Sequence, residues 1–173
     1  DGSGTLDVLS ASHDDDTFAL YLNDGSQSFT ELVITTSATE ARSVVAKDVN
    51  GDGAMDAVSA GGSNTVSGTL DWYQNDGSES FTTHQVASMT NGYSVVAADL
   101  DGDGDVDIAS AHNTDDTVAW HENDGSESFT DHVITSLADA VYDVQVADVD
   151  GDGDLDALAA SNLDNSVTRQ RRR

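Results

Sequence analysis

Three nine-residue segments carry oxygen-bearing side chains at their first, third, fifth and ninth positions, with glycines at the fourth and sixth. They read DVNGDGAMD from residue 48, DLDGDGDVD from residue 99 and DVDGDGDLD from residue 148. Glycine lets the backbone curl, so that alternate residues face one point. Such a point suits a hard cation that takes roughly six to eight oxygen ligands, and calcium tolerates irregular geometry better than magnesium. The sequence therefore predicts three calcium loops.

Each full loop offers side-chain ligands and one main-chain carbonyl, at position 7. The predicted side-chain ligands are Asp48, Asn50, Asp52 and Asp56, then Asp99, Asp101, Asp103 and Asp107, then Asp148, Asp150, Asp152 and Asp156. The predicted carbonyl ligands belong to Ala54, Asp105 and Asp154. Alanine shares this position with aspartate, which favours a main-chain ligand. An EF-hand is excluded, because it needs a glutamate at position 12, where this sequence has Ser59, Ser110 and Ala159.

A fragment of the same pattern, DGSGTLD, opens the sequence. It retains Asp1, Ser3, Thr5 and Asp7 at positions 3, 5, 7 and 9. Position 1 of this loop would precede the first residue. The fragment therefore predicts a fourth calcium site that is only partial.

Composition limits the classes of partner. The chain has 173 residues, 33 acidic side chains against 6 basic ones and a formal net charge of -27. Such a surface repels nucleic acids and anionic membranes, and the sequence lacks the run of about eighteen apolar residues that inserts into a bilayer. The absence of cysteine excludes disulfides and thiolate metal sites. No basic, hydrophobic leader opens the sequence, so we expect any signal peptide to lie outside it.

The loops belong to a longer repeat. Gly2, Gly51, Gly102 and Gly151 occupy the same loop position, at spacings of 49, 51 and 49 residues. A second segment, NDGSQSFT or NDGSESFT, recurs at residues 23, 75 and 123. Within the third unit, short β-branched or aromatic runs at 93–100, 107–112, 116–123 and 129–136 predict four strands. Four antiparallel strands in about fifty residues are typical of a β-propeller blade.

Aligning the units predicts one all-β array of propeller-type four-stranded antiparallel blades, about three and a half repeats long. Its parts are a partial blade at 1–41, full blades at 42–90 and 91–138, and a partial blade at 139–173. The first unit lacks the strand before its loop, and the last lacks its outermost strand. We therefore expect a partial propeller or one completed by oligomerisation. The expected fourteen strands are half the number in a seven-bladed ring.

The D-x-D-G-D-G-x-x-D loop, set in a unit of about fifty residues with an NDGS turn, resembles the FG-GAP/VCBS repeat. This is the calcium-binding blade of integrin-α-type β-propellers, and the resemblance covers essentially the whole chain. It implies calcium held between the first two strands of each blade. It also implies a secreted, bacterial protein with an extracellular or cell-surface role in adhesion, matrix or ligand binding. One departure is Arg169, which stands where the other units have Trp72 and Trp120.

No catalytic pattern is visible in the sequence. It contains neither H-E-x-x-H nor G-x-S-x-G, so we expect that the protein is not an enzyme. Five histidines fall on predicted strands or loop edges and are expected at the surface: His13, His84, His112, His121 and His132. The acidic runs Asp14–Asp16 and Asp115–Asp116 are interpreted as solvated turns, with a secondary cation site as the alternative.

These patterns leave three classes of function open. The first is a structural or adhesive module whose partners are other copies of the chain, in a ring or filament. The second is a lectin-like propeller that binds glycans or surface proteins. The third is a non-catalytic part of a longer secreted repeat protein or enzyme. Four recurring aromatics are expected in the core between blades rather than on a sugar-binding platform: Trp72, Trp120, Tyr21 and Tyr73. No nucleic acid or membrane insertion is expected.

Overall fold

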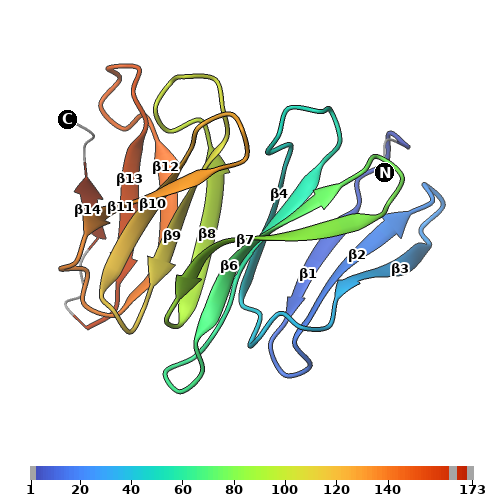
Figure 1. Ribbon diagram of the computed structural model, residues 1–173, viewed down its shortest axis with the longest axis horizontal. Coiled ribbons are helices and arrows are strands. Elements are labelled where there is room, and N and C mark those ends of the chain that lie inside the picture. The colour runs from blue at the N-terminus through green and yellow to red at the C-terminus, as the bar shows by residue number, and fades with distance from the viewer. Residues whose placement is uncertain (1–2, 164–166, 171–173) are drawn as a thin grey trace.

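The computed structural model describes residues 3–163 and 167–170, which form four successive antiparallel sheets (Figure 1). We call these sheets blades 1 to 4. Their strands are β1 (Val8–Ser12), β2 (Thr17–Asn23) and β3 (Phe29–Thr35); β4 (Ser43–Lys47), β5 (Asp56–Ala60), β6 (Gly68–Asn75) and β7 (Phe81–Met89); β8 (Gly92–Ala98), β9 (Asp107–His112), β10 (Thr117–Asn123) and β11 (Phe129–Thr135); β12 (Val141–Ala147), β13 (Asp156–Ser161) and β14 (Val167–Gln170). The described residues contain no helix that could span a membrane.

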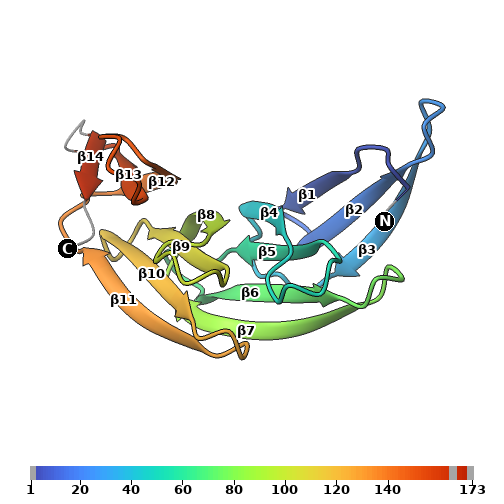
Figure 2. The same cartoon turned by 90° about the horizontal axis from the view of Figure 1, so that it is seen from above.

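Strands within each blade follow chain order, so each hydrogen-bonded pair is a hairpin. β1 follows the opening loop as β5, β9 and β13 follow theirs. Among the residues that the structure describes, blade 1 has no strand at the innermost position, which β4, β8 and β12 occupy elsewhere, and blade 4 has none at the outermost position. The all-β, propeller-type prediction is confirmed, including three, four, four and three strands. Seen from above, β4 and β8 lie on the concave side and β7 and β11 on the convex side (Figure 2).

The NDGS segment makes the turn between the third and fourth strands of a blade. In blade 2 the amide of Asp76 donates to the carbonyl of Ser80 at 3.0 Å. Gly77 has φ +77°, a left-handed conformation that glycine adopts without steric cost. Asn75 and Phe81 then pair across the hairpin. The repeated segment thus fixes the register of the outer hairpin.

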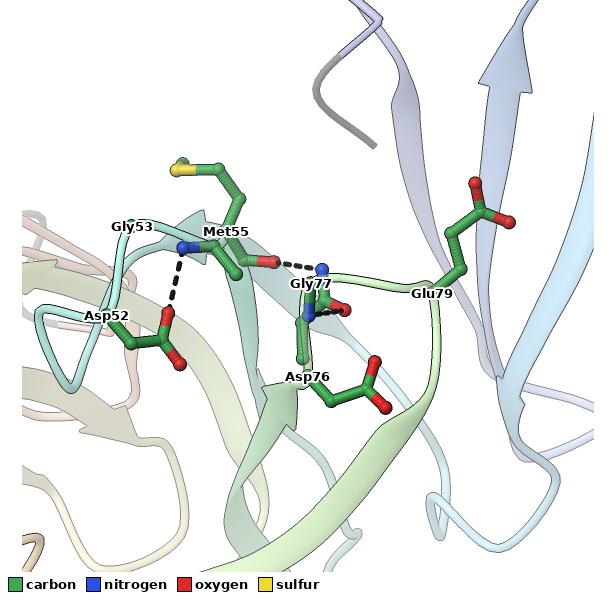
Figure 3. A pocket seen from close by; sticks show the side chains of 8 residues that line it. Asp52, Gly53, Met55, Asp76, Gly77 and Glu79 are labelled. Atoms are coloured by element: carbon green, nitrogen blue, oxygen red, sulfur yellow. Dashed lines mark hydrogen bonds between the residues drawn. The ribbon is translucent and has the colours of Figure 1, made fainter.

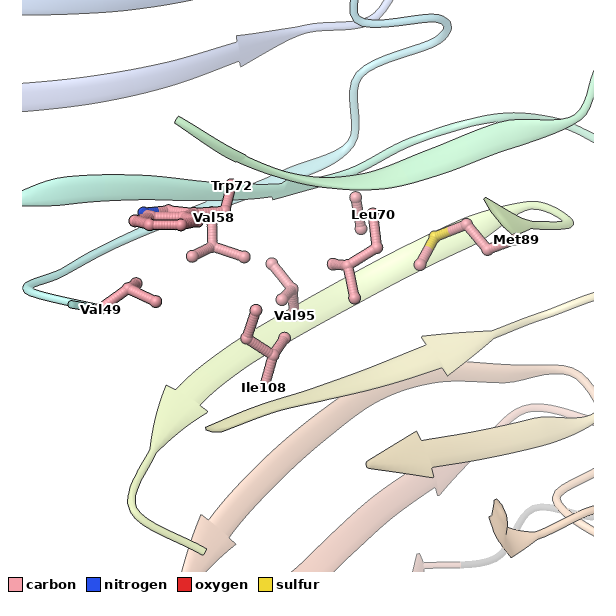
Figure 4. Packing of buried hydrophobic residues seen from close by; sticks show 8 residues of the cluster. Val49, Val58, Leu70, Trp72, Met89, Val95 and Ile108 are labelled. Carbon is pink, nitrogen blue, oxygen red and sulfur yellow. The ribbon is translucent and has the colours of Figure 1, made fainter. Parts of the chain in front are cut away.

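The hydrophobic core lies between blades. Between blades 2 and 3, Trp72, Val58 and Leu70 pack with Ile108 and other residues, all of them buried (Figure 4). Full burial of one large apolar side chain stabilises by about 1.5–3 kcal/mol. The prediction that recurring aromatics form the inter-blade core is confirmed for Trp72 and for Tyr73, which are 0% and 1% exposed. Those two rings are therefore not part of a sugar-binding platform.

β14 carries the departure from the aromatic pattern. Arg169 pairs with Leu158, as Trp120 pairs with Ala109 in blade 3. This register places Arg169 at the position of the tryptophans, as the sequence alignment indicates. The remaining arginines of the basic C-terminal run, 171–173, lie outside the described residues.

Two of the acidic turn residues have a structural role. Asp16 accepts a hydrogen bond from the amide of Glu40 at 2.7 Å, and Asp116 accepts one from the amide of Ala140 at 2.9 Å. Each bond joins the turn that follows β1 or β9 to the connection that leads into the next blade. These contacts give aspartate a structural role at both turns.

Candidate metal sites

Each full loop curls around the carboxylate at its first position. Asp48 accepts hydrogen bonds from the amides of Gly51 at 2.8 Å and Gly53 at 3.0 Å. Gly51 and Gly53 have φ of +73° and +91°, where a side chain would be strained. Asp99 and Asp148 make the same pair of contacts in their loops. The glycines thus orient the first carboxylate before any cation arrives.

Positions 3 and 5 are held by short turns in which a side-chain oxygen accepts the amide two residues ahead. In blade 3, Asp101 accepts from Asp103 at 3.1 Å, and Asp103 accepts from Asp105 at 3.0 Å. The other full loops repeat both contacts. This chain of turns directs successive carboxylates to one side of the loop.

Two loops gather three carboxylates close enough to hold one metal ion. Oxygens of Asp99, Asp101 and Asp103 all lie within 4.8 Å of one another, and so do oxygens of Asp148, Asp150 and Asp156. At loop position 3, where the other two full loops have an aspartate, the loop of blade 2 has Asn50. The side-chain amide of Asn50 donates to Asp52 at 3.1 Å. Carboxylates this close repel one another without a cation. All donors are oxygens, which fits a hard divalent cation and disfavours a soft one.

The aspartate at position 9 has a structural role in addition to its predicted role as a cation ligand. Asp107 is fully buried, and its two oxygens accept the amides of Leu100 at 2.9 Å and Asn123 at 2.8 Å. Asp56 makes the equivalent contacts with Val49 and Asn75. One carboxylate therefore ties the start of the loop to the NDGS turn of the same blade. The sequence predicted this aspartate as a cation ligand but not as the link between loop and turn.

Burial raises the pKa of the Asp56 and Asp107 carboxyls, and the amides that they accept oppose this rise. Nearby carboxylates, Asp52 for Asp56 and Asp101 for Asp107, raise the pKa further. The ionised carboxylate therefore costs free energy in the metal-free loop. A bound cation would offset this cost, which couples cation binding to folding.

An acidic hollow lies beside the loop of blade 2 (Figure 3). It measures about 560 Å³ and is lined by Asp52 from the loop and by Asp76 and Glu79 from the NDGS turn. The carbonyl of Met55 accepts the side-chain amide of Asn75 at 3.1 Å, so loop and turn form one wall. Clustered carboxylates in a hollow concentrate cations near the loop.

The opening loop is described from Ser3 onward, and Asp1 lies outside the described residues. The Thr5 hydroxyl donates to the carbonyl of Asn23 at 2.6 Å, and Asp7 accepts the amide of Asn23 at 2.8 Å. The link between loop and turn is therefore kept in blade 1. The described part of this loop holds only one of the carboxylates that fill a full loop, so the partial site stays a prediction.

Blade 3 contains a buried polar network that sequence reasoning missed. The Ser110 hydroxyl lies 2.8 Å from Nε2 of both His112 and His121, and Nδ1 of His121 lies 2.7 Å from Asp131. The expectation that all histidines lie at the surface is wrong for His112 and His121, which are 9% and 1% exposed. Alternation along β9 places Ser110 and His112 on the same face as Ile108, which packs against blade 2.

The network resembles a Ser-His-Asp triad in its distances. His121 donates through Nδ1 to the Asp131 carboxylate, which leaves Nε2 to accept the Ser110 hydroxyl, while the Ser110 oxygen accepts Nε2–H of His112. Ser110 is fully buried, however. It does not line the acidic hollow of blade 2. The contacts therefore serve to satisfy polar groups between blades 2 and 3.

Acidification is expected to destabilise the fold through these histidines. Burial lowers the pKa of His112 and His121, with the contact to Asp131 opposing this for His121. The folded state then binds fewer protons than the unfolded state. The free energy of unfolding should fall as the pH drops below about 6.5, by at most about 1.4 kcal/mol per pH unit for each histidine.

The variant His121→Tyr tests this, because Tyr73 occupies the equivalent position in blade 2. Thermal unfolding with saturating calcium, compared between about pH 7 and pH 5.5, should show a smaller drop in melting temperature for the variant. The variant His13→Asn is the control, since the His13 side chain is 45% exposed. Equal drops in His121→Tyr and the unaltered protein would contradict this role.

The fold and the loops define a repeat protein of propeller type, with an acidic loop between the first two strands of a blade. The family model of the FG-GAP-like repeat matches residues 1–59, 48–110 and 99–159. Each match begins at one acidic loop and runs through the next. The chain therefore belongs to the FG-GAP-like repeat family. No curated protein matches the chain.

Proposed function

We propose that the chain is an extracellular calcium-binding repeat module with a structural or adhesive role and no catalytic activity. The observation that carries this proposal is the preformed loop, in which amides orient carboxylates that converge within 4.8 Å in two of the three full loops. FG-GAP-like repeats are typical of extracellular proteins. Calcium sites of extracellular modules work at dissociation constants of roughly 0.1–1 mM, which suits loops this exposed.

Calcium titration by calorimetry is the direct test. We expect about three binding events per chain, one for each full loop, and little heat from magnesium, which holds its waters and demands stricter geometry. The variants Asp52→Ala, Asp103→Ala and Asp152→Ala should each remove one event and leave the others, because blades of a repeat protein contact only their neighbours. Absence of calcium heat, or loss of all events in one variant, would contradict the assignment.

The partner that we propose is another copy of the chain. Among the described strands, β1 pairs only with β2, and the edge that β4, β8 and β12 cover in other blades has no strand beside it. An unpaired edge is a template for association. A seven-bladed ring of two copies would need three whole blades built from both copies of blades 1 and 4. Those partial blades contain too few innermost and too few outermost strands to make three whole blades. A closed ring of two copies is therefore disfavoured. An open, filament-like association fits better.

A further inference from the structure

The two end blades expose positions that inner blades bury. We call the face of a blade that meets the preceding blade its front face, and the opposite one its rear face. On the front face of blade 1, Val8 is 50% exposed, whereas Ile108 and Ala57 at the same position are 0% and 1% exposed. Phe29 is 50% exposed, whereas the equivalent Phe129 packs against the core between blades 2 and 3.

The rear face of blade 4 shows the matching pattern. Val149 is 50% exposed, whereas the equivalent Val49 in blade 2 is 3% exposed and belongs to the core shared with blade 3. Tyr142 is 42% exposed. Its equivalent in blade 3, Tyr93, packs its ring on Tyr142 with centroids 4.6 Å apart. Blade 4 thus presents apolar groups where a following blade would sit.

The chain contains the template for a contact between these faces. Between blades 2 and 3, rear-face residues Val58 and Trp72 pack against front-face residue Ile108 (Figure 4). Between blades 3 and 4, rear-face residues Ala109 and Ala111 pack against front-face residue Val144. At both of these junctions an apolar rear face therefore meets an apolar front face.

The distribution of charge also favours contact between the two end faces. At the junction of blades 2 and 3, Asn50 shares a hollow of about 240 Å³ with Asp105 and Glu127. At the equivalent positions of blade 1 the residues are Thr5 and Gln27, both uncharged. The front face of blade 1 thus lacks two of the carboxylates that would repel an acidic loop. With a net charge of -27 per chain, the missing carboxylates reduce the repulsion between two copies at this contact.

We propose that the rear face of blade 4 in one copy packs against the front face of blade 1 in a second copy. This inference rests on the proposed function and specifies its assembly. The contact joins different surfaces of the two copies, so it repeats head to tail and produces open assemblies unless the rotation closes. Calcium promotes it, because loaded loops bring less negative charge to each junction.

Sedimentation over a protein concentration series in saturating calcium is the test. The unaltered chain should rise above its monomer mass of 18.0 kDa, whereas Val8→Asp and Val149→Gln should each stay monomeric. The matched control is Val133→Asp, because Val133 is 67% exposed on β11, away from both end faces. It should assemble as the unaltered chain does.

A mixture of the two single-face variants gives the sharpest outcome. Each retains one intact end face, so the mixture should form a dimer of twice 18.0 kDa and no larger species. A mixture that stays monomeric would overturn the head-to-tail contact, as would assembly of Val8→Asp alone. If the unaltered chain binds calcium and stays monomeric, this inference fails and the calcium module stands. If calcium does not bind, the proposed function itself fails.

Discussion

Removal of calcium is expected to lower the melting temperature by about 20 °C. A ligand that binds only the folded state, at one hundred times its dissociation constant, stabilises by about 2.7 kcal/mol per site. Three full loops then contribute about 8 kcal/mol in total, and each kcal/mol shifts the midpoint by roughly 2–4 °C in a chain of this size. The buried carboxylates of Asp56 and Asp107, which are costly to ionise without a cation, add to the dependence.

Thermal unfolding followed by circular dichroism, in excess calcium and in excess chelator, measures this shift. Restoring calcium after chelation should restore the midpoint, and magnesium at the same concentration should restore much less of it. A midpoint that is the same in calcium and in chelator would show that the loops are not structural metal sites.

Replacement of Asp107 by alanine is expected to destabilise the protein even in chelator. The substitution removes the carboxylate that accepts the amides of Leu100 and Asn123. Loss of an acceptor for a buried amide, as at Asn123, costs about 1–3 kcal/mol, so the free energy of unfolding should fall by about 1–3 kcal/mol. Urea unfolding in the presence of chelator measures the loss of these hydrogen bonds separately from any loss of calcium binding.

Asp103→Ala is the matched control, because Asp103 is an exposed member of the same loop and accepts the local amide of Asp105. In chelator it should change the free energy of unfolding much less than Asp107→Ala does. In calcium both variants should lose one site. If the two variants unfold alike in chelator, position 9 acts only as a cation ligand and does not hold the loop to the turn.

The repeat, the strand number in each blade and the convergence of carboxylates in two of the three full loops were predictable, because all depend on local spacing. The bond from Asp107 to Asn123 was not, since it joins a loop to a turn sixteen residues away. It forms only once β9 and β10 pair in their particular register. A count of carboxylates identifies candidate ligands but not the ones that also accept backbone amides.

The buried histidines illustrate the same limit. His112 and His121 come from two strands, and only the pairing of β9 with β10 brings both to Ser110. One signal was available in the sequence. The position of His121 holds Tyr73 in the second unit, so an aromatic core position had become a histidine. That replacement predicts a buried imidazole with polar partners rather than an exposed one.

The order of strands within each blade also determines how the molecule responds to mechanical force. Successive blades are joined by single crossings, at residues 36–42, 90–91 and 136–140, and every hydrogen-bonded sheet is contiguous in sequence. Tension along the chain therefore loads the side-chain contacts between blades before it shears a sheet. Blade 2, residues 43–89, would release roughly 160 Å of chain when it unravels. A series of such blades under tension therefore lengthens in discrete steps, and each unfolding step dissipates mechanical energy that would otherwise load the remaining structure.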